Sequence, residues 1–166
     1  MRLYLTGFMG AGKTTVGHLL AQRLAVDFVD LDARIEAHRG QPITAIFEGE
    51  GEAGFRRLET ECLRLTVELR DSVVATGGGT PVDLANRDWM RRHGRIVWLD
   101  VPFSELVARL AVDGSRPLFR DVAAAEQLFA SRSEAYGDCD LRIDAGELEP
   151  GEIVSAIVEK LEPAIG

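Results

Sequence analysis

Short apolar runs alternate with segments of helical periodicity along most of the chain. Strands are predicted where β-branched and aromatic residues form a run bounded by polar residues or glycine. These strands are residues 2–6, 26–30, 72–76, 95–100 and 141–143. Helices are predicted where apolar residues recur at a spacing of three or four. These helices are residues 13–25, 34–38, 52–69, 83–92, 104–111, 123–136 and 153–161, with a separate helical turn at 43–48. The alternation predicts an α/β fold, with a parallel sheet covered by helices on both faces.

Polar or glycine-rich segments lie at the ends of three predicted strands. Residues 7–14 follow the first strand, Asp30 and Asp32 lie at the end of the second, and the triplet 77–79 follows the third. Ligands of such sheets bind beyond the carboxyl ends of the strands, so we expect these segments to form one site. The chain has no internal repeat and no low-complexity linker, which predicts a single domain over residues 1–166.

Composition and charge exclude several classes of protein. The 166 residues are 46% hydrophobic and 28% charged, which argues against disorder. The net charge of −8 argues against partners such as nucleic acid or an anionic membrane, since both need a basic face. No apolar run approaches the roughly 18 residues of a membrane span, and early glycines interrupt any signal peptide. The two cysteines, Cys62 and Cys139, favour a reducing cytoplasm over a disulfide framework or a zinc site.

The segment Gly7-Phe8-Met9-Gly10-Ala11-Gly12-Lys13-Thr14 matches the phosphate-binding pattern G-x-x-x-x-G-K-[ST] between a predicted strand and a predicted helix. Its glycines allow consecutive backbone N–H groups to face an anion, and the helix adds its N-terminal dipole. Lys13 can reach the β- and γ-phosphates, and the Thr14 hydroxyl can coordinate Mg²⁺. The sequence therefore predicts a nucleotide site, and the ATP contacts expected in this segment are Gly10, Ala11, Gly12, Lys13, Thr14 and Thr15. The third strand is followed directly by Gly77, and it lacks the terminal aspartate usual in P-loop ATPases.

Five further motifs follow the phosphate loop in a fixed order. They are D-x-D at 30–32, F-R-R-x-E at 55–59, G-G-G at 77–79, R-P-L at 116–118 and R-x-x-x-Y at 132–136. This ordered set resembles the shikimate kinase family over nearly the whole chain. The resemblance implies transfer of the ATP γ-phosphoryl to the 3-hydroxyl of shikimate, with Mg²⁺ as cofactor. It also implies a cytoplasmic monomer with a three-layer α/β/α P-loop fold and strand order 2-3-1-4-5.

The resemblance assigns the acceptor side of the site to the region of about residues 31–60, the glycine triplet and the last motif. Asp32 would hold the acceptor hydroxyl and take its proton, and Asp30 would order Mg²⁺ through water. Arg56 and Arg132 would bind the shikimate carboxylate, since guanidinium groups bind carboxylates bidentately. The remaining predicted acceptor contacts are Gly77, Gly78, Gly79, Phe47 and Phe55. Glu59 could hold Arg56 from the same helix face.

On the nucleotide side, the resemblance assigns residues 112–121 to a lid that closes over the phosphates. Arg116 would bring positive charge to the transferring phosphoryl group when the lid closes. Arg109 would contact the adenine. The three catalytic residues implied by the resemblance are thus Lys13, Asp32 and Arg116.

Structural alternatives remain for several of these residues. Asp30 or Asp32 could instead cap the following helix. Arg109 could be an ordinary surface residue, as we interpret Arg57, and the two phenylalanines could belong to the core. The sequence also departs from the family pattern where Glu134 replaces a common proline beside Arg132. A gluconate-type kinase and a catalytically inactive nucleotide-binding module remain alternative functions.

Overall fold

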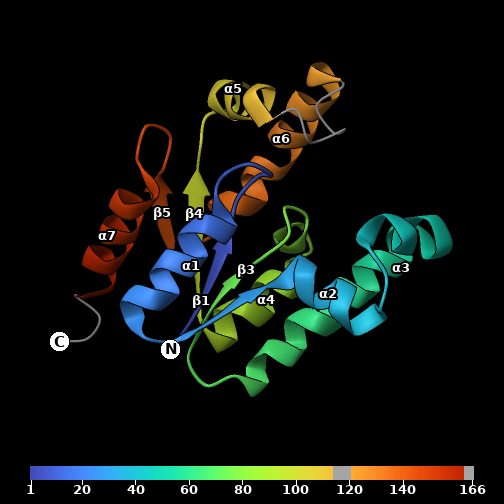
Figure 1. The fold of residues 1–166 in the computed structure, drawn as a ribbon, viewed down its shortest axis with the longest axis horizontal. Coiled ribbons are helices and arrows are strands. Elements are labelled where there is room, and N and C mark those ends of the chain that lie inside the picture. Colours follow the sequence, from blue (N-terminus) through green and yellow to red (C-terminus); the bar gives the residue numbers. More distant parts are fainter. Residues whose placement is uncertain (114–120, 163–166) are drawn as a thin grey trace.

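The computed structural model describes residues 1–113 and 121–162, except for the side chains of 111–113. Its centre is a sheet of five strands in the order β2-β3-β1-β4-β5, and every neighbouring pair is parallel (Figure 1). The strands are β1 (Arg2–Thr6), β2 (Asp27–Asp30), β3 (Ser72–Ala75), β4 (Arg95–Asp100) and β5 (Leu141–Asp144). The predicted strands and the strand order implied by the resemblance are confirmed.

Helices connect the strands as crossovers. They are α1 (Lys13–Leu24), α2 (Leu31–Arg39), α3 (Ile43–Leu65), α4 (Leu84–His93), α5 (Phe103–Asp113), α6 (Val122–Gly137) and α7 (Pro150–Leu161), with short 3₁₀ turns η1 (Thr66–Glu68) and η2 (Thr80–Val82). Within the described ranges, no helix is long and apolar enough to cross a membrane.

Three helices differ from the prediction: α2 and α7 each begin three residues earlier, and α3 joins two predicted segments. The predicted turn at 43–48 and the helix at 52–69 form one element, α3, kinked at Gly51. Gly51 has φ 70°, which glycine adopts without the steric cost of a Cβ, so the chain bends there and continues as helix. Helix α2 begins three residues earlier than predicted, because the Asp30 carboxylate accepts a hydrogen bond from the Ala33 N–H and caps it.

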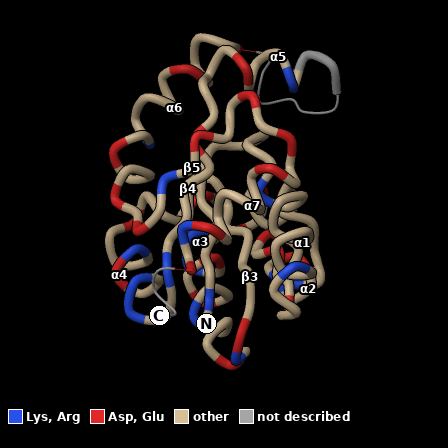
Figure 2. The backbone as a smooth tube through the Cα atoms, turned by 90° about the vertical axis from the view of Figure 1, so that its left-hand side faces the viewer, with Lys and Arg blue, Asp and Glu red and all other residues tan. Residues whose placement is uncertain are grey.

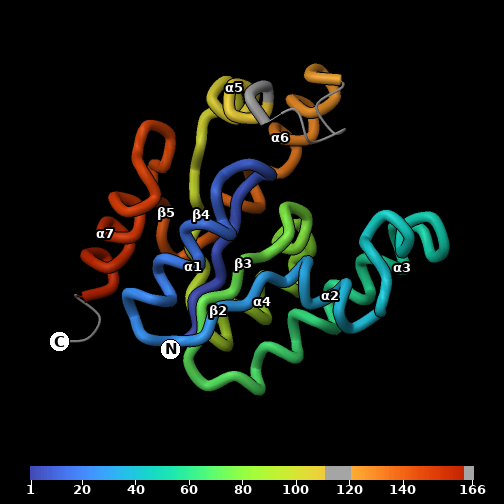
Figure 3. The backbone as a smooth tube through the Cα atoms, viewed as in Figure 1, coloured from blue at the N-terminus to red at the C-terminus, as the bar shows by residue number. Residues whose placement is uncertain are grey.

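Successive side chains of the strands point to opposite faces of the sheet and pack into two separate cores, one on each face. Leu3 and Leu5 of β1 lie in the core shared with α1 and α7, whereas Tyr4 lies in the core shared with α2, α3 and α4. This is the three-layer arrangement that a parallel sheet needs to bury both faces. The backbone trace shows the loops after β1 and β3 at the same end of the sheet, near α5 and α6 (Figure 3). The predicted site therefore lies at this end.

Candidate active site

The phosphate loop joins β1 to α1 in a conformation that depends on its glycines. Gly7, Gly10 and Gly12 all have positive φ, at 141°, 80° and 92°. At Gly7 a Cβ would also lie only 2.8 Å from the Leu99 carbonyl oxygen, so a side chain there would collide with β4. The Lys13 Nζ donates hydrogen bonds to the Gly7 and Phe8 carbonyls, at 2.6 Å and 3.0 Å. The ammonium group is thereby held over the loop, where it can meet an anion.

Asp30 caps α2, which is one of the two interpretations made from the sequence, and its second carboxylate oxygen contacts Thr14. Its Oδ1 caps α2, and its Oδ2 accepts a hydrogen bond of 2.9 Å from the Thr14 hydroxyl. The two residues predicted to order Mg²⁺ are thus brought together from the ends of β2 and the phosphate loop. Hydroxyl and carboxylate oxygens are hard donors that suit Mg²⁺, which keeps several of its waters. The pair fits this cofactor.

Asp32 lies in the first turn of α2 and does not cap that helix, since Asp30 does. The pKa of Asp32 is raised to about 6, chiefly by burial and then by the negative charges of Asp30 and Glu59, against an opposing effect of Lys13. A carboxylate with a pKa near the working pH is suited to take a proton from an acceptor hydroxyl. Asp32 is therefore the strongest candidate base of this site.

One cleft of about 440 Å³ contains both the phosphate loop and the candidate base. Its walls include Gly10, Gly12, Lys13, Thr14, Thr15, Asp30, Asp32, Gly77 and Gly78. Ala11 is buried beneath the loop instead, with its side chain in the core shared with α1 and α7. The cleft therefore combines predicted nucleotide contacts, metal-binding groups and acceptor contacts from three strand ends.

Arg56 projects from α3 toward the glycine triplet. Its Nη1 lies 2.9 Å from Oε1 of Glu59, whose side chain is 1% exposed, and Oε2 of that glutamate accepts from the Thr80 hydroxyl at 2.9 Å. The buried Glu59 thus orients Arg56, as predicted from the spacing of the two. A Cβ on Gly79 would lie 2.4 Å from Arg56 Nη1, so only glycine leaves room for the guanidinium there.

Arg132 reaches the other side of the triplet from α6. Its Nη1 would lie 3.1 Å from a Cβ at Gly78, and its guanidinium sits 5.9 Å from the centre of the Phe8 ring. A cavity of about 400 Å³ is lined by Arg132, Arg56, Glu59 and Gly79. The two arginines predicted to share one carboxylate therefore face a common space, and Glu134 is exposed on α6.

Tyr136 is a site residue to which the sequence analysis assigned no role. It is 1% exposed, and its hydroxyl donates a hydrogen bond of 2.7 Å to the Gly78 carbonyl. Burial raises the pKa of Tyr136 to about 12, against the opposing charge of Arg132, so the hydroxyl keeps its proton. The signal was present in the R-x-x-x-Y motif, since residues four apart share a helix face.

The remaining predicted contacts are two phenylalanines and two arginines, and those that the structure describes differ in how far they are exposed. Phe55 is 5% exposed within the core, and Phe47, 37% exposed, packs on it with ring centres 4.6 Å apart. Arg109 is partly buried and donates to the carbonyls of Gly10 and Gly146, at 3.4 Å and 3.0 Å, so it is not a free surface arginine. Arg116, with most of the predicted lid, lies outside the described residues.

Comparisons with known proteins agree with this geometry. Residues 9–162 match the family model for shikimate kinase. A shikimate kinase from Sulfurihydrogenibium sp. is 41% identical over 161 residues, covering 96% of this chain and 97% of that protein. The crystal structure of shikimate kinase from Bacteroides thetaiotaomicron matches with a TM-score of 0.91 and 35% identity over 98% of both chains. Shikimate kinase from Acinetobacter baumannii in complex with shikimate matches with a TM-score of 0.90 and 34% identity, over 98% of this chain and 93% of that one. This chain belongs to the shikimate kinase family of ATP-dependent phosphotransferases.

Proposed function

We propose that this chain transfers the γ-phosphoryl group of ATP to the 3-hydroxyl of shikimate. The observation that carries the assignment of roles is that Asp32 and Lys13 line one cleft at the carboxyl end of the sheet. In the reaction, the acceptor oxygen attacks the γ-phosphorus while the bond from that phosphorus to the β–γ bridging oxygen breaks, releasing ADP. Asp32 takes the proton of the acceptor hydroxyl. Lys13 and the backbone N–H groups of the phosphate loop hold the phosphates and offset their charge.

Acceptor recognition falls to the two arginines around the second cavity. A carboxylate bound between Arg56 and Arg132 would place a cyclohexene ring beside the triplet, where Gly78 offers its backbone without a side chain. Gly77 leaves room for the side-chain carboxylate of Asp32, since a Cβ at position 77 would lie 3.1 Å from Asp32 Oδ1. The Phe55 and Phe47 pair acts as support for Arg56, whose guanidinium lies 5.2 Å from the Phe55 ring centre.

Mg²⁺ is the cofactor we propose to accompany ATP, held by Thr14 and, through water, by Asp30. When bound, it supplies positive charge to the β- and γ-phosphate oxygens. The hydrogen bond between these two side chains supports the assignment, because it shows their oxygens converging on one point of the cleft.

We also propose that residues 1–166 form a single kinase domain that acts as a cytoplasmic monomer. Both cysteines are free thiols, as expected in a reducing compartment. Sedimentation of the purified protein tests the monomer.

A coupled assay of ADP release is the direct test of the acceptor. Shikimate, gluconate and AMP are offered in parallel at equal concentration, each with ATP and Mg²⁺. We expect turnover with shikimate alone. Turnover with gluconate or AMP would point to another small-molecule kinase, and absence of turnover with all three would indicate a nucleotide-binding module without catalysis.

Arg56→Ala and Arg132→Ala are each expected to weaken shikimate binding far more than ATP binding, because each removes one partner of the acceptor carboxylate. Loss of a charged hydrogen-bond partner typically costs about 1.5–3 kcal/mol, or roughly 10- to 150-fold in Kd. Isothermal titration with each ligand measures the difference. Arg57→Ala is the matched control, since Arg57 is the adjacent, exposed arginine of the same helix. An equal loss of affinity for shikimate and for ATP would mean that these arginines stabilise the fold instead. If Arg56→Ala weakened shikimate binding and Arg132→Ala did not, the cause would be Glu134, which stands beside Arg132 in place of the family's common proline.

Arg116→Ala is expected to lower kcat, to reduce ATP affinity modestly and to leave shikimate binding nearly unchanged. The reason is that a lid arginine contributes its charge only when the lid closes over bound nucleotide. Steady-state rates together with titration of each ligand separate these effects. Unchanged kcat would remove Arg116 from the catalytic residues.

A further inference from the structure

Two neighbouring side chains of α4 bind the segment that directly follows the glycine triplet. The Asn86 Nδ2 donates to the Thr80 carbonyl at 3.1 Å. The Arg87 Nη1 donates to the carbonyls of Pro81 and Val82, at 2.6 Å and 3.1 Å. All three carbonyls of η2 are therefore held from one helix. Because η2 begins at the residue after Gly79, these contacts limit where the triplet can lie.

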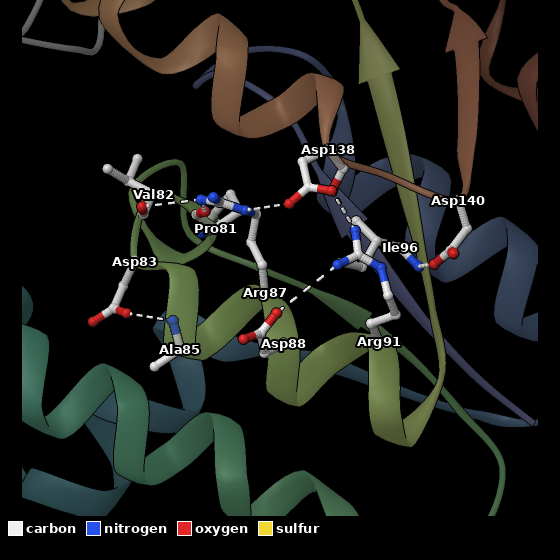
Figure 4. A network of polar contacts seen from close by, with 10 residues as sticks. All are labelled: Pro81, Val82, Asp83, Ala85, Arg87, Asp88, Arg91, Ile96, Asp138 and Asp140. Atoms are coloured by element: carbon white, nitrogen blue, oxygen red, sulfur yellow. Dashed lines mark hydrogen bonds and ion pairs between the residues drawn. The ribbon is translucent and has the colours of Figure 1, made fainter.

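Arg87 also binds the end of the helix that carries Arg132. Its Nε lies 2.9 Å from Oδ2 of Asp138, the residue that follows α6 (Figure 4). The second oxygen of Asp138 accepts from Arg91, one turn further along α4. Hydrogen bonds from Arg87 and Arg91 hold the pKa of the Asp138 carboxyl below its usual range, so the carboxylate stays charged. The blue positions along α4 in the charge-coloured trace are arginines, which include Arg87 and Arg91 (Figure 2).

The two partners of Arg87 belong to opposite halves of the acceptor site. One half is the backbone of Gly78 and Gly79, which η2 continues. The other half is α6, whose Arg132 lies beside Gly78 and whose Tyr136 is bonded to the Gly78 carbonyl. The guanidinium fork spans both halves at once, and its side chain is only 14% exposed. Arg91, in contrast, is 40% exposed; within the part of the chain that the structure describes, it binds Asp138 and makes no hydrogen bond to η2.

We propose that Arg87 is a positioning residue for acceptor binding, which sets the distance between the glycine triplet and Arg132 by bridging η2 and Asp138. This inference rests on the proposed acceptor site. Arg87 touches no substrate; it acts through the backbone of η2 and through α6. A displacement of about 1 Å in groups that orient a substrate can cost about 10²-fold in rate. Because the Arg87 bridge joins two parts of the acceptor site, its loss should weaken shikimate binding more than ATP binding.

The test compares Arg87→Gln with Arg91→Gln, a control on the same helix with the same carboxylate partner. For Arg87→Gln we expect the Kd and KM of shikimate to rise by about tenfold or more, with the Kd of ATP nearly unchanged. Arg91→Gln should leave both ligands nearly unchanged. Arg87→Lys keeps a charge beside Asp138 but lacks the fork that reaches three oxygens, so it should retain most of the shikimate defect. Isothermal titration and steady-state kinetics with each substrate varied provide the readouts.

Equal losses for shikimate and ATP in Arg87→Gln, or equal shikimate losses in Arg87→Gln and Arg91→Gln, would overturn the proposal. If Arg87→Gln fails to fold, Asp138→Asn serves instead, because it weakens the bridge to α6 and leaves the contacts of α4 with η2 in place. It should raise the KM of shikimate selectively, and an unchanged KM would overturn the proposal as well. Arg132→Ala, measured alongside, keeps the two claims apart: if it loses shikimate while Arg87→Gln does not, only the bridge is wrong. If Arg132→Ala binds shikimate normally, the acceptor site itself is wrong.

Discussion

Lys13→Ala is expected to lower kcat by about 10²- to 10³-fold, the loss typical of removing one preorganised group that stabilises charge in a transition state. The Lys13 ammonium is held over the phosphate loop by the Gly7 and Phe8 carbonyls, so its charge is already placed before the nucleotide arrives. An alanine leaves the backbone N–H groups of the loop but no side-chain cation from that loop. Coupled ADP release at saturating shikimate measures the effect.

Lys160→Ala is the matched control for this variant. Lys160 is the only other lysine of the chain and donates to the Arg142 carbonyl near the end of α7. It should turn over like the unmodified protein. Near-normal turnover in Lys13→Ala would remove the assignment of the nucleotide site.

Asp32→Asn is expected to lower kcat by about 10²-fold or more while ATP binding is retained. Asparagine keeps the size and one acceptor oxygen of Asp32 but cannot take the proton of the acceptor hydroxyl. Because the pKa of Asp32 is raised to about 6, the carboxylate form is lost as the pH falls through 6. The kcat/KM of the unmodified enzyme should therefore decrease below about pH 6, two units above the range of an ordinary aspartate, and this decrease should be absent in the variant.

Glu36→Gln provides the control for Asp32→Asn, since Glu36 lies one turn further along α2 and lines the same cleft. Glu36→Gln should keep its turnover and a decrease at low pH. The midpoint of that decrease should move slightly downward, because the charge of Glu36 is the smallest of the causes that raise the pKa of Asp32. If Asp32→Asn turned over normally, or lost activity without losing the pH dependence, proton transfer to Asp32 would be refuted. A role in the local packing of α2 would then explain the residue better.

Features encoded by neighbouring residues were predictable. The phosphate loop is contiguous, and its glycines, lysine and threonine lie within eight positions, so its conformation follows from local backbone preferences and the adjoining helix. The alternation of strands and helices likewise predicted a parallel sheet, because parallel strands require crossovers. Where this local reasoning was wrong, as at Gly51, the helix resumed after a kink because its apolar face still had a core to pack against.

The candidate site could be described only from the sequence and the tertiary structure together. Asp30 was predicted either to cap α2 or to serve the metal, and the structure shows that each carboxylate oxygen has its own partner. Asp32 was placed by the resemblance, but its raised pKa comes from burial and from Glu59, which belongs to another helix. Local sequence carries no information on that environment, since desolvation depends on the packing of distant segments.

By itself, the sequence determined the nucleotide loop, the α/β class and, through its ordered motifs, the family. Only the tertiary structure decided how Tyr136 meets Gly78, 58 positions away, and how Arg87 meets Asp138, 51 positions away. Such contacts arise when the register of the sheet and the packing of α4 and α6 bring distant segments to one edge. A buried hydroxyl such as that of Tyr136 must find a hydrogen-bond partner, and the half-buried Arg87 finds a charged one. Which partner is in reach is decided by the folded arrangement and not by spacing along the chain.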